Sequence, residues 1–110
     1  MRKRIFFKGD IPSSVADIVV AICRDRNRRV MLLGSAKLDA DHRDEYERLN
    51  SAIDKALISI EPVLRGIIFN DISSGAGYSK TPAKNIVGKR GYLARKRTVI
   101  CQIALNLGIF

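Results

Sequence analysis

Apolar side chains recur at steps of three and four residues along most of the chain, and this spacing predicts α-helices. The first helix is expected to begin at Ser13 or Ser14, which are good capping residues, and to end at Gly34. Its apolar face contains Val15, Ile18, Val19, Ile22, Val30 and Leu33. A run of arginines interrupts this face, which predicts a solvated turn in the middle of a long helix.

Acidic residues cluster at the start of the second predicted helix. Carboxylates are favoured there because the free N–H groups and the dipole of a helix N-terminus attract negative charge. The cluster contains Asp39, Asp41, Asp44, Glu45 and Glu47. The apolar stripe that follows contains Tyr46, Leu49, Ile53, Leu57 and Ile60. We therefore expect a helix that starts near residue 39 and ends before Pro62.

Pro62 is expected to open a third helix, because proline is well tolerated at the first helical position. The apolar face of this helix contains Leu64, Ile67, Ile68 and Ile72. The glycine-containing segment 73–77 then ends it as a connector. Thr81 and Pro82 repeat the signal of a cap followed by a first helical residue, which predicts a short fourth helix up to about Gly88.

The last predicted helix follows a brief turn around Gly88 to Gly91 and continues toward the end of the sequence. Its apolar flank contains Val99, Ile100, Ile103, Ala104 and Leu107, and its exposed stripe contains Arg95, Thr98, Gln102 and Asn106. Lys96 is the exception, because it projects toward the middle of the apolar arc. Either its ammonium reaches the edge of the packed surface, or the packed part of the helix starts later.

The predicted fold is an all-α single compact domain of four or five helices. A chain of 110 residues is long enough for one modest core. Residues 10–72 are expected to form a helical support. Residues 78–110 have the sequence shape of a helix-turn-helix-like pair, in which a short helix, a glycine-containing turn and a longer basic helix follow one another.

Charge is distributed unevenly along this chain. The net charge is +9, which favours an anionic partner. Residues 37–71 contain 5 basic and 8 acidic residues, whereas residues 72–110 contain 7 basic residues and no acidic one. A surface that is merely soluble more often mixes the two signs. The C-terminal third is therefore the candidate for nucleic-acid binding.

The expected location is cytoplasmic. The apolar run 5–7 is too short for the core of a signal peptide, and no apolar run approaches the length of a membrane span. Cys23 and Cys101 lie in apolar-periodic stretches, which favours buried free thiols in a reducing compartment, although one disulfide stays an alternative. No membrane contact is expected.

Enzymatic, metal-dependent and nucleotide-dependent functions find little support in the sequence. His42 is the single histidine and sits in the acidic helix start, with no second histidine or cysteine at ligand spacing. The loop 73–77 lacks the Gly-Lys-Ser/Thr ending of a phosphate-binding loop. Tyr78, Ser79 and Lys80 resemble a catalytic cluster only in composition. We expect no catalytic residue, metal site or cofactor.

Several segments together resemble small phage-encoded transcriptional regulators whose C-terminal helix-turn-helix is similar to that of sigma factors. The segments are residues 23–29 (CRDRNRR), 45–50 (EYERLN), 52–54 (AID), 65–72 and 91–97 (GYLARKR). The resemblance implies promoter DNA as a partner and contact with RNA polymerase as a further one. The chain departs from the usual pattern at Leu93, where those regulators have serine two residues after the turn glycine.

The function expected from the sequence is a sequence-directed, DNA-binding transcription regulator that contacts double-stranded DNA. Base edges are expected to be contacted by Arg95, Thr98 and Gln102. Phosphates are expected to be contacted by Lys80, Lys84, Lys89, Arg90 and Arg97, and Lys96 is expected in the same interface. The arginine run supplies a second candidate contact through Arg24, Arg26, Arg28 and Arg29, and a solvated helix face is its alternative.

Two other functions stay open at this point. RNA is an alternative ligand, although only 6% of the residues are aromatic and none is Trp, which disfavours stacking on single strands. The other alternative is a protein-interaction module that contacts RNA polymerase or another regulator. A homodimer is also compatible with the sequence, because helix-turn-helix proteins often pair.

Overall fold

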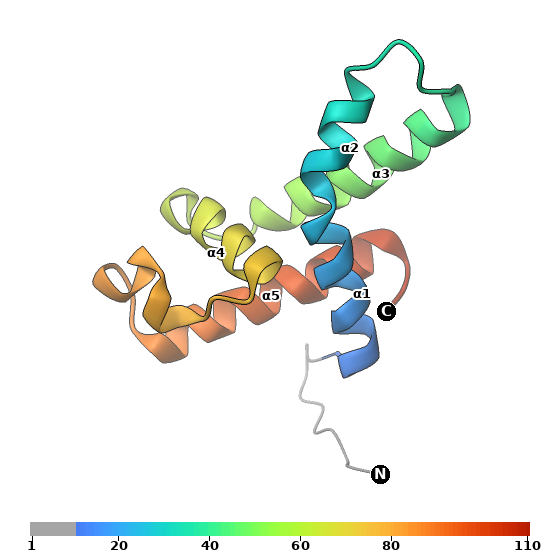
Figure 1. Ribbon diagram of the computed structural model, residues 1–110. Helices are drawn as coiled ribbons and strands as arrows, with labels where there is room; N and C mark the ends of the chain where they lie inside the picture. The colour runs from blue at the N-terminus through green and yellow to red at the C-terminus, as the bar shows by residue number, and fades with distance from the viewer. Residues whose placement is uncertain (1–10) are drawn as a thin grey trace.

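A computed structural model describes residues 11–110, and five α-helices make up most of this part of the chain (Figure 1). They are α1 (Ser13–Arg24), α2 (Arg26–Leu33), α3 (Ala40–Leu57), α4 (Pro62–Ser74) and α5 (Lys89–Leu107). Two short 3-10 helices, η1 (Tyr78–Lys80) and η2 (Pro82–Asn85), join α4 to α5. The prediction of one all-α domain with four or five helices is confirmed. The run 5–7, used above for the signal-peptide argument, lies outside the described residues.

The first predicted helix is divided into α1 and α2 at Asp25. In an uninterrupted helix the carbonyl of Ile22 would accept the N–H of residue 26. Here it accepts a hydrogen bond of 2.7 Å from the buried guanidinium of Arg29 instead. The expected serine cap is also wrong, because Pro12 occupies the capping position without a side-chain hydrogen bond and Ser13 is already helical. The predicted end at Gly34 is confirmed.

The boundaries of α3 and α4 are those that the sequence predicts. The carboxylate of Asp39 accepts the backbone N–H of His42 at 2.9 Å and caps α3. Pro62 is the first residue of α4, and Gly75 ends that helix with φ 74°. A left-handed residue at this position is accessible to glycine at little cost, which explains the sharp end of the helix.

The segment between α4 and α5 differs from the prediction in two respects. The expected short helix is the single 3-10 turn η2, although Thr81 does cap it by accepting the N–H of Ala83. The turn before the terminal helix ends earlier than expected, because α5 already begins at Lys89. Gly91 therefore lies inside the first turn of α5. A pair of consecutive α-helices, as in a helix-turn-helix, is not formed by residues 78–107.

The core lies where α3 and α5 pack along each other and α1 crosses α4 and α5 (Figure 1). Its fully buried side chains include Val19, Ile53, Leu64, Ile68, Tyr92, Val99 and Ile103. These contacts bury the apolar flank of the second half of α5, as predicted, whereas Leu105 on another side of the helix is exposed. α2 packs on the first half of α3, and these two helices form a hairpin that extends away from the core.

Candidate nucleic-acid interface

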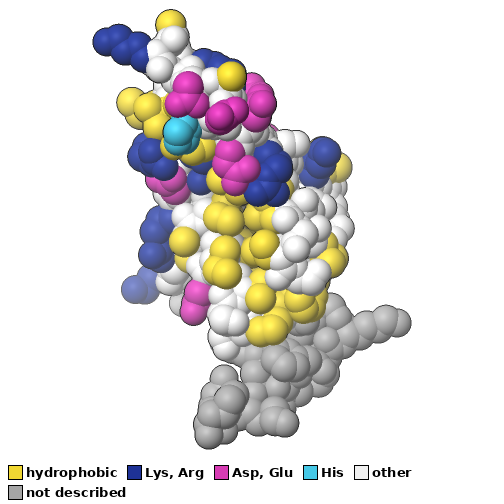
Figure 2. Space-filling view, turned by 90° about the vertical axis from the view of Figure 1, so that its right-hand side faces the viewer, with side chains coloured by type: hydrophobic (Ala, Val, Ile, Leu, Met, Phe, Trp, Pro, Cys, Tyr) yellow, Lys and Arg dark blue, Asp and Glu magenta, His cyan; other side chains and the backbone are white. Residues whose placement is uncertain are grey.

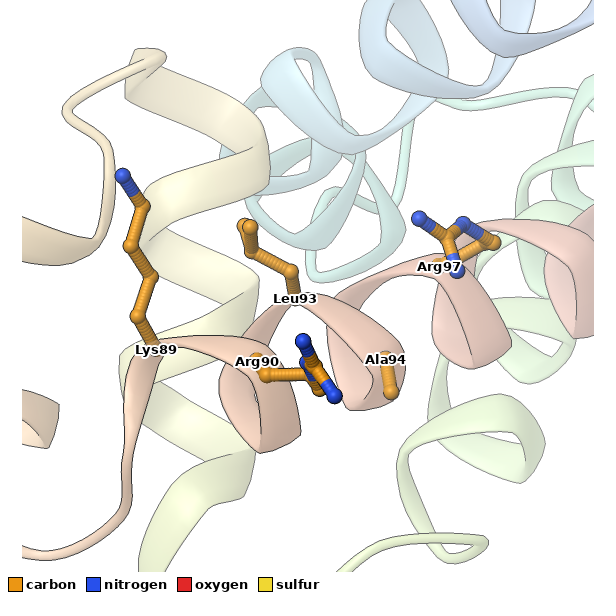
Figure 3. Close-up of a pocket in the computed structure, with 5 residues that line it drawn as sticks. All are labelled: Lys89, Arg90, Leu93, Ala94 and Arg97. Atoms are coloured by element: carbon orange, nitrogen blue, oxygen red, sulfur yellow. The ribbon is translucent and has the colours of Figure 1, made fainter.

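The first half of α5 presents one exposed face to solvent at the end of the molecule opposite the α2–α3 hairpin (Figure 1). A groove of about 450 Å³ runs along this face. It is lined by Lys89, Arg90, Leu93, Ala94 and Arg97 (Figure 3). We call these five residues the α5 basic face. Their spacing of four and three residues places them on one side of the helix.

The predicted reading stripe lies elsewhere on α5. At about 3.6 residues per turn, its mean direction is roughly 150° from that of the α5 basic face. Arg95 and Gln102 are partly buried, which corrects the expectation that they are exposed. The hydroxyl of Thr98 donates to the carbonyl of Ala94 at 3.0 Å, and the amide of Asn106 donates to the carbonyl of Ala52 at 3.0 Å. Asn106 therefore ties this side of α5 to α3, whereas Thr98 bonds within α5 itself and is exposed.

Arg95 is fixed by Glu61, which lies between α3 and α4. Its guanidinium donates three hydrogen bonds of 2.6 to 2.9 Å to the Glu61 carboxylate and a fourth of 3.0 Å to the carbonyl of Gly91. Hydrogen bonds from Arg95 lower the pKa of Glu61 from 4.5 to about 2. The sequence suggests Arg95 as a base contact, but in the structure its fork-shaped donor group already has a carboxylate partner.

Lys96 points into the protein, as its position in the apolar arc implies. Its ammonium lies 3.1 Å from the carboxylate of Asp71, a residue of α4 that is 1% exposed. The same carboxylate accepts hydrogen bonds from the hydroxyl of Tyr92 at 2.6 Å and from the N–H of Gly77 at 2.8 Å. Burial alone would raise the pKa of Asp71, but these donors together hold it below the usual value. Lys96 is thus a packing residue, and its assignment to the interface is corrected.

Four of the five predicted phosphate contacts lie together at the leading end of α5, and the fifth, Arg97, lies about two turns farther along the helix. Lys89 and Arg90 belong to its first turn, and Lys80 and Lys84 lie in η1 and η2, which directly precede it. All four side chains are exposed and form no ion pair within residues 11–110. No acidic residue occurs between residues 72 and 110 to neutralise them.

Most arginines elsewhere in the described chain form hydrogen bonds within the protein, whereas Lys37 and Lys55 are exposed. The four arginines of the predicted second contact all donate within the protein. Arg24 binds the carbonyl of Ser73, Arg26 binds Asp54, Arg28 binds Asp25, and Arg29 binds Asn50. Arg29 is 2% exposed, and burial lowers its pKa. Arg24, Arg26 and Arg29 thus join α1 and α2 to α3 and α4. Arg24 and Arg28 are nevertheless exposed, so a second phosphate contact at these two residues stays a prediction.

Neither a metal-binding group nor a disulfide is formed in the described part of the chain. No group of three or more histidine, cysteine, aspartate or glutamate side chains in residues 11–110 is placed to hold a metal ion. Cys23 and Cys101 are both buried and form no disulfide, as predicted. Burial raises the pKa of Cys23 to about 11. Within the same residues, none of the helices has the length and apolar character needed to cross a membrane.

Sequence reasoning missed Leu93 and Ala94 as part of the exposed face. Their signal was present, because residues 89, 93 and 97 and residues 90 and 94 are each four apart. The helical projection was instead centred on Arg95, since a long polar side chain is usually exposed. Glu61 and Asp71, which decide the orientation of α5, come from other elements and leave no trace in the periodicity of α5.

No protein-family model matches the chain, and no curated protein or solved structure matches it. The function therefore has to be argued from the geometry and charge of the α5 basic face and its neighbours.

Proposed function

We propose that this protein binds duplex DNA through the leading end of α5 and acts as a DNA-binding transcription regulator of the phage type. The observation that carries the proposal is the contrast between two groups of cations. Eight arginines elsewhere in residues 11–110 donate to acceptors of the protein itself. Arg90 and the three lysines beside it have no such acceptor in the described chain.

The local structure favours an anion at this place. α5 begins without a capping side chain and without an acidic residue in its first turn, so its positive dipole end is uncompensated. Lys89 and Arg90 add two full charges to that same turn. Such an arrangement costs stability in the isolated protein and is relieved by a phosphate, which accepts from free N–H groups and from cations alike.

A helix with an exposed cationic end fits the major groove of duplex DNA, which is about 12 Å wide and admits one α-helix. The aromatic rings of the described chain do not offer a stacking surface at this end, because Tyr92 is buried and Tyr78 packs against it with ring centroids 5.2 Å apart. Duplex nucleic acid is therefore the preferred ligand over an extended single strand. The sequence resemblance to phage regulators makes promoter DNA the first duplex to test.

A salt titration of duplex binding tests the proposal directly. Four cations at the leading end, namely Lys80, Lys84, Lys89 and Arg90, predict a slope of log affinity against log salt of roughly −3.6. The measurement is fluorescence anisotropy with a labelled duplex of random sequence. A slope near zero would contradict phosphate binding. Stronger competition by structured RNA than by duplex DNA would contradict the choice of DNA.

A further inference from the structure

α1 is apolar on almost every side, although only part of its circumference is buried. Its stretch 15–23 contains a single polar residue, Asp17. Val19 is fully buried in the core, whereas Ile18 is 48% exposed and Ala21 is exposed as well. A helix that is apolar all round is normally covered all round. The outer side of α1 is thus apolar surface that the described residues leave exposed.

Hydrophobic side chains gather on the side of the molecule that α1 forms. α1 lies at the right of Figure 1, and Figure 2 views the molecule from that direction. A hydrophobic area occupies the middle of this view, next to the mixed charges of the hairpin end (Figure 2). The C-terminus lies on the same side (Figure 1), and Ile109 and Phe110 are exposed there. Contiguous apolar areas of this kind mark sites of association.

The outer side of α1 also carries one acidic and one basic side chain that can form ion pairs. Asp17 is exposed and forms no ion pair within residues 11–110. Arg24 is exposed, and its Nε donates to the carbonyl of Ser73 at 2.9 Å, while its terminal nitrogens have no acceptor in the described chain. The two residues are seven positions apart, so they lie on the same side of α1 and about 10 Å apart along its axis.

This order of charges is complementary to itself when two copies of α1 pack antiparallel. A two-fold axis that crosses the outer side midway between Asp17 and Arg24 places Asp17 of each copy against Arg24 of the other. A parallel pair would instead oppose like charges, which repel. Ala21 lies beside the axis, and its small side chain lets the two helices approach closely. Ile18 of each copy then packs against the other helix.

We propose that the outer side of α1 is the contact surface of a homodimer, in which two copies of α1 pack antiparallel around Ile18 and Ala21 and form reciprocal Asp17–Arg24 ion pairs. The charges of the face favour a second copy over an unrelated protein, because only a second copy supplies the same two charges in reversed order. The start of α5 lies away from α1 (Figure 1), so this contact leaves the cationic ends of both copies uncovered. Dimerisation therefore does not depend on the ligand that the start of α5 binds.

Sedimentation equilibrium of the full chain tests the proposal. Each copy carries a charge of +9, so the measurement is made at about 0.15 M salt, where a Debye length of about 8 Å limits their repulsion. We expect a dimer fraction that rises with protein concentration. Ile18→Ser removes an exposed apolar side chain from both halves of the contact, so Kd should rise about tenfold. Met31→Ser is the matched control, because Met31 is 78% exposed but belongs to α2, and it should leave Kd unchanged.

Charge reversal tests the pairing of Asp17 with Arg24. Asp17→Lys and Arg24→Glu each convert two attractive pairs into repulsive ones, so each variant alone should show a Kd about tenfold higher or more. An equimolar mixture of the two variants should associate again, since the changed residue of each variant then faces an opposite charge. Asp17 has no hydrogen bond or ion pair within the described residues, so Asp17→Lys should remain folded even if Arg24→Glu, which loses its bond to Ser73, does not. Thermal unfolding checks both variants.

Cysteine cross-linking tests the direction of the two helices. Ala21 lies beside the proposed axis, whereas Ser14 is exposed on the same side of α1 but about 10 Å from the axis. Under mild oxidation by air, Ala21→Cys should form a disulfide between the copies, because a disulfide needs Cα atoms within about 7 Å. Ser14→Cys, about 20 Å from its counterpart, should not. The native Cys23 and Cys101 are buried and should not interfere.

Three results would overturn the proposal. A wild-type protein that stays monomeric at every concentration would show that no second copy covers α1, and it would leave duplex binding by the start of α5 untouched. A dimer that resists both Ile18→Ser and the charge reversals would show that another surface joins the copies. Cross-linking of Ser14→Cys as efficient as that of Ala21→Cys would contradict the antiparallel arrangement.

Discussion

Lys96 of α5 reaches the buried carboxylate of Asp71 in α4, with Nζ 3.1 Å from Oδ1. Tyr92, one turn earlier in α5, donates to the other oxygen of the same carboxylate. The N–H of Gly77 from the connector completes the set of donors. One carboxylate thus joins α4, the loop that follows it and α5. The rotation of α5, and with it the direction of the α5 basic face, depends on this group.

Replacing Lys96 by methionine should therefore destabilise the domain. The substitution keeps most of the packing volume but leaves Asp71 without its cation. Breaking a buried ion pair costs about 3–5 kcal/mol, and we expect about 2 kcal/mol here because a quarter of the Lys96 side chain is exposed to screening. Urea unfolding measures the difference. Arg90→Met, in the same helix, should change the free energy of unfolding by less than about 0.5 kcal/mol. Equal effects of the two variants would show that Asp71 does not need the ammonium.

The ion pair between Glu61 and Arg95 predicts a dependence of stability on pH. The carboxylate has a pKa of about 2 in the folded protein and 4.5 as an ordinary glutamate, so between these values the unfolded chain binds more protons. The stabilisation is complete above pH 4.5 and is lost as the pH falls toward 2. Unfolding of wild type and Glu61→Gln should differ most at pH 6 and converge toward pH 2. A difference that is constant over this range would contradict the pair.

Two helix-associated glycines should respond to alanine with opposite sign. Gly66 lies on the exposed side of α4, and an added Cβ would meet no atom within 4 Å. Alanine should stabilise the protein there by about 0.5–1 kcal/mol, because glycine loses more backbone entropy in a helix. At Gly75, φ is 74°, so alanine is strained and should destabilise by about 1 kcal/mol. Thermal unfolding of both variants tests the end of α4, and stabilisation by Gly75→Ala would contradict the left-handed residue.

Duplex affinity should depend on where a lysine is removed. Lys84→Gln removes a charge beside the leading end of α5, and Lys37→Gln removes the same charge at the tip of the α2–α3 hairpin. Both lysines are exposed and form no ion pair within the described residues. We expect Lys84→Gln to weaken binding to all sequences alike and to reduce the salt slope by roughly 1, whereas Lys37→Gln changes neither. The same loss from both variants would mean that net charge alone governs binding.

Local signals in the sequence predicted the helical class and several boundaries correctly. Asp39, Pro62 and Gly75 each act within one turn of the helix end that they define. The break at Asp25 was not predictable in this way. It depends on Arg29, whose burial against Asn50 requires α3 to lie beside α2.

The orientation of the candidate interface was also not predictable from local sequence signals alone. The apolar flank of α5 followed from periodicity, and four of its five predicted residues are buried: Val99, Ile103, Ala104 and Leu107. Periodicity cannot show which polar side of a helix another element covers. Glu61 lies 34 positions from Arg95 and covers that side. A projection of one helix therefore wrongly predicts a polar side chain to be exposed when its partner is distant in the sequence.

Charge differs between the α2–α3 hairpin and the start of α5. Residues 26–57 contain 7 basic and 6 acidic residues, whereas residues 72–110 contain 7 basic residues and no acidic one. Figure 2 shows acidic and basic side chains mixed at the end of the molecule that carries the hairpin, and Figure 1 places the start of α5 away from that end. Within a Debye length of about 8 Å the opposite charges of the hairpin largely cancel, whereas the cations at the start of α5 add to one another. Uncompensated positive charge is thus concentrated around the start of α5. Under the proposed function, a polyanion attracts this end of the protein most strongly, so that more encounters begin with the start of α5 facing the duplex.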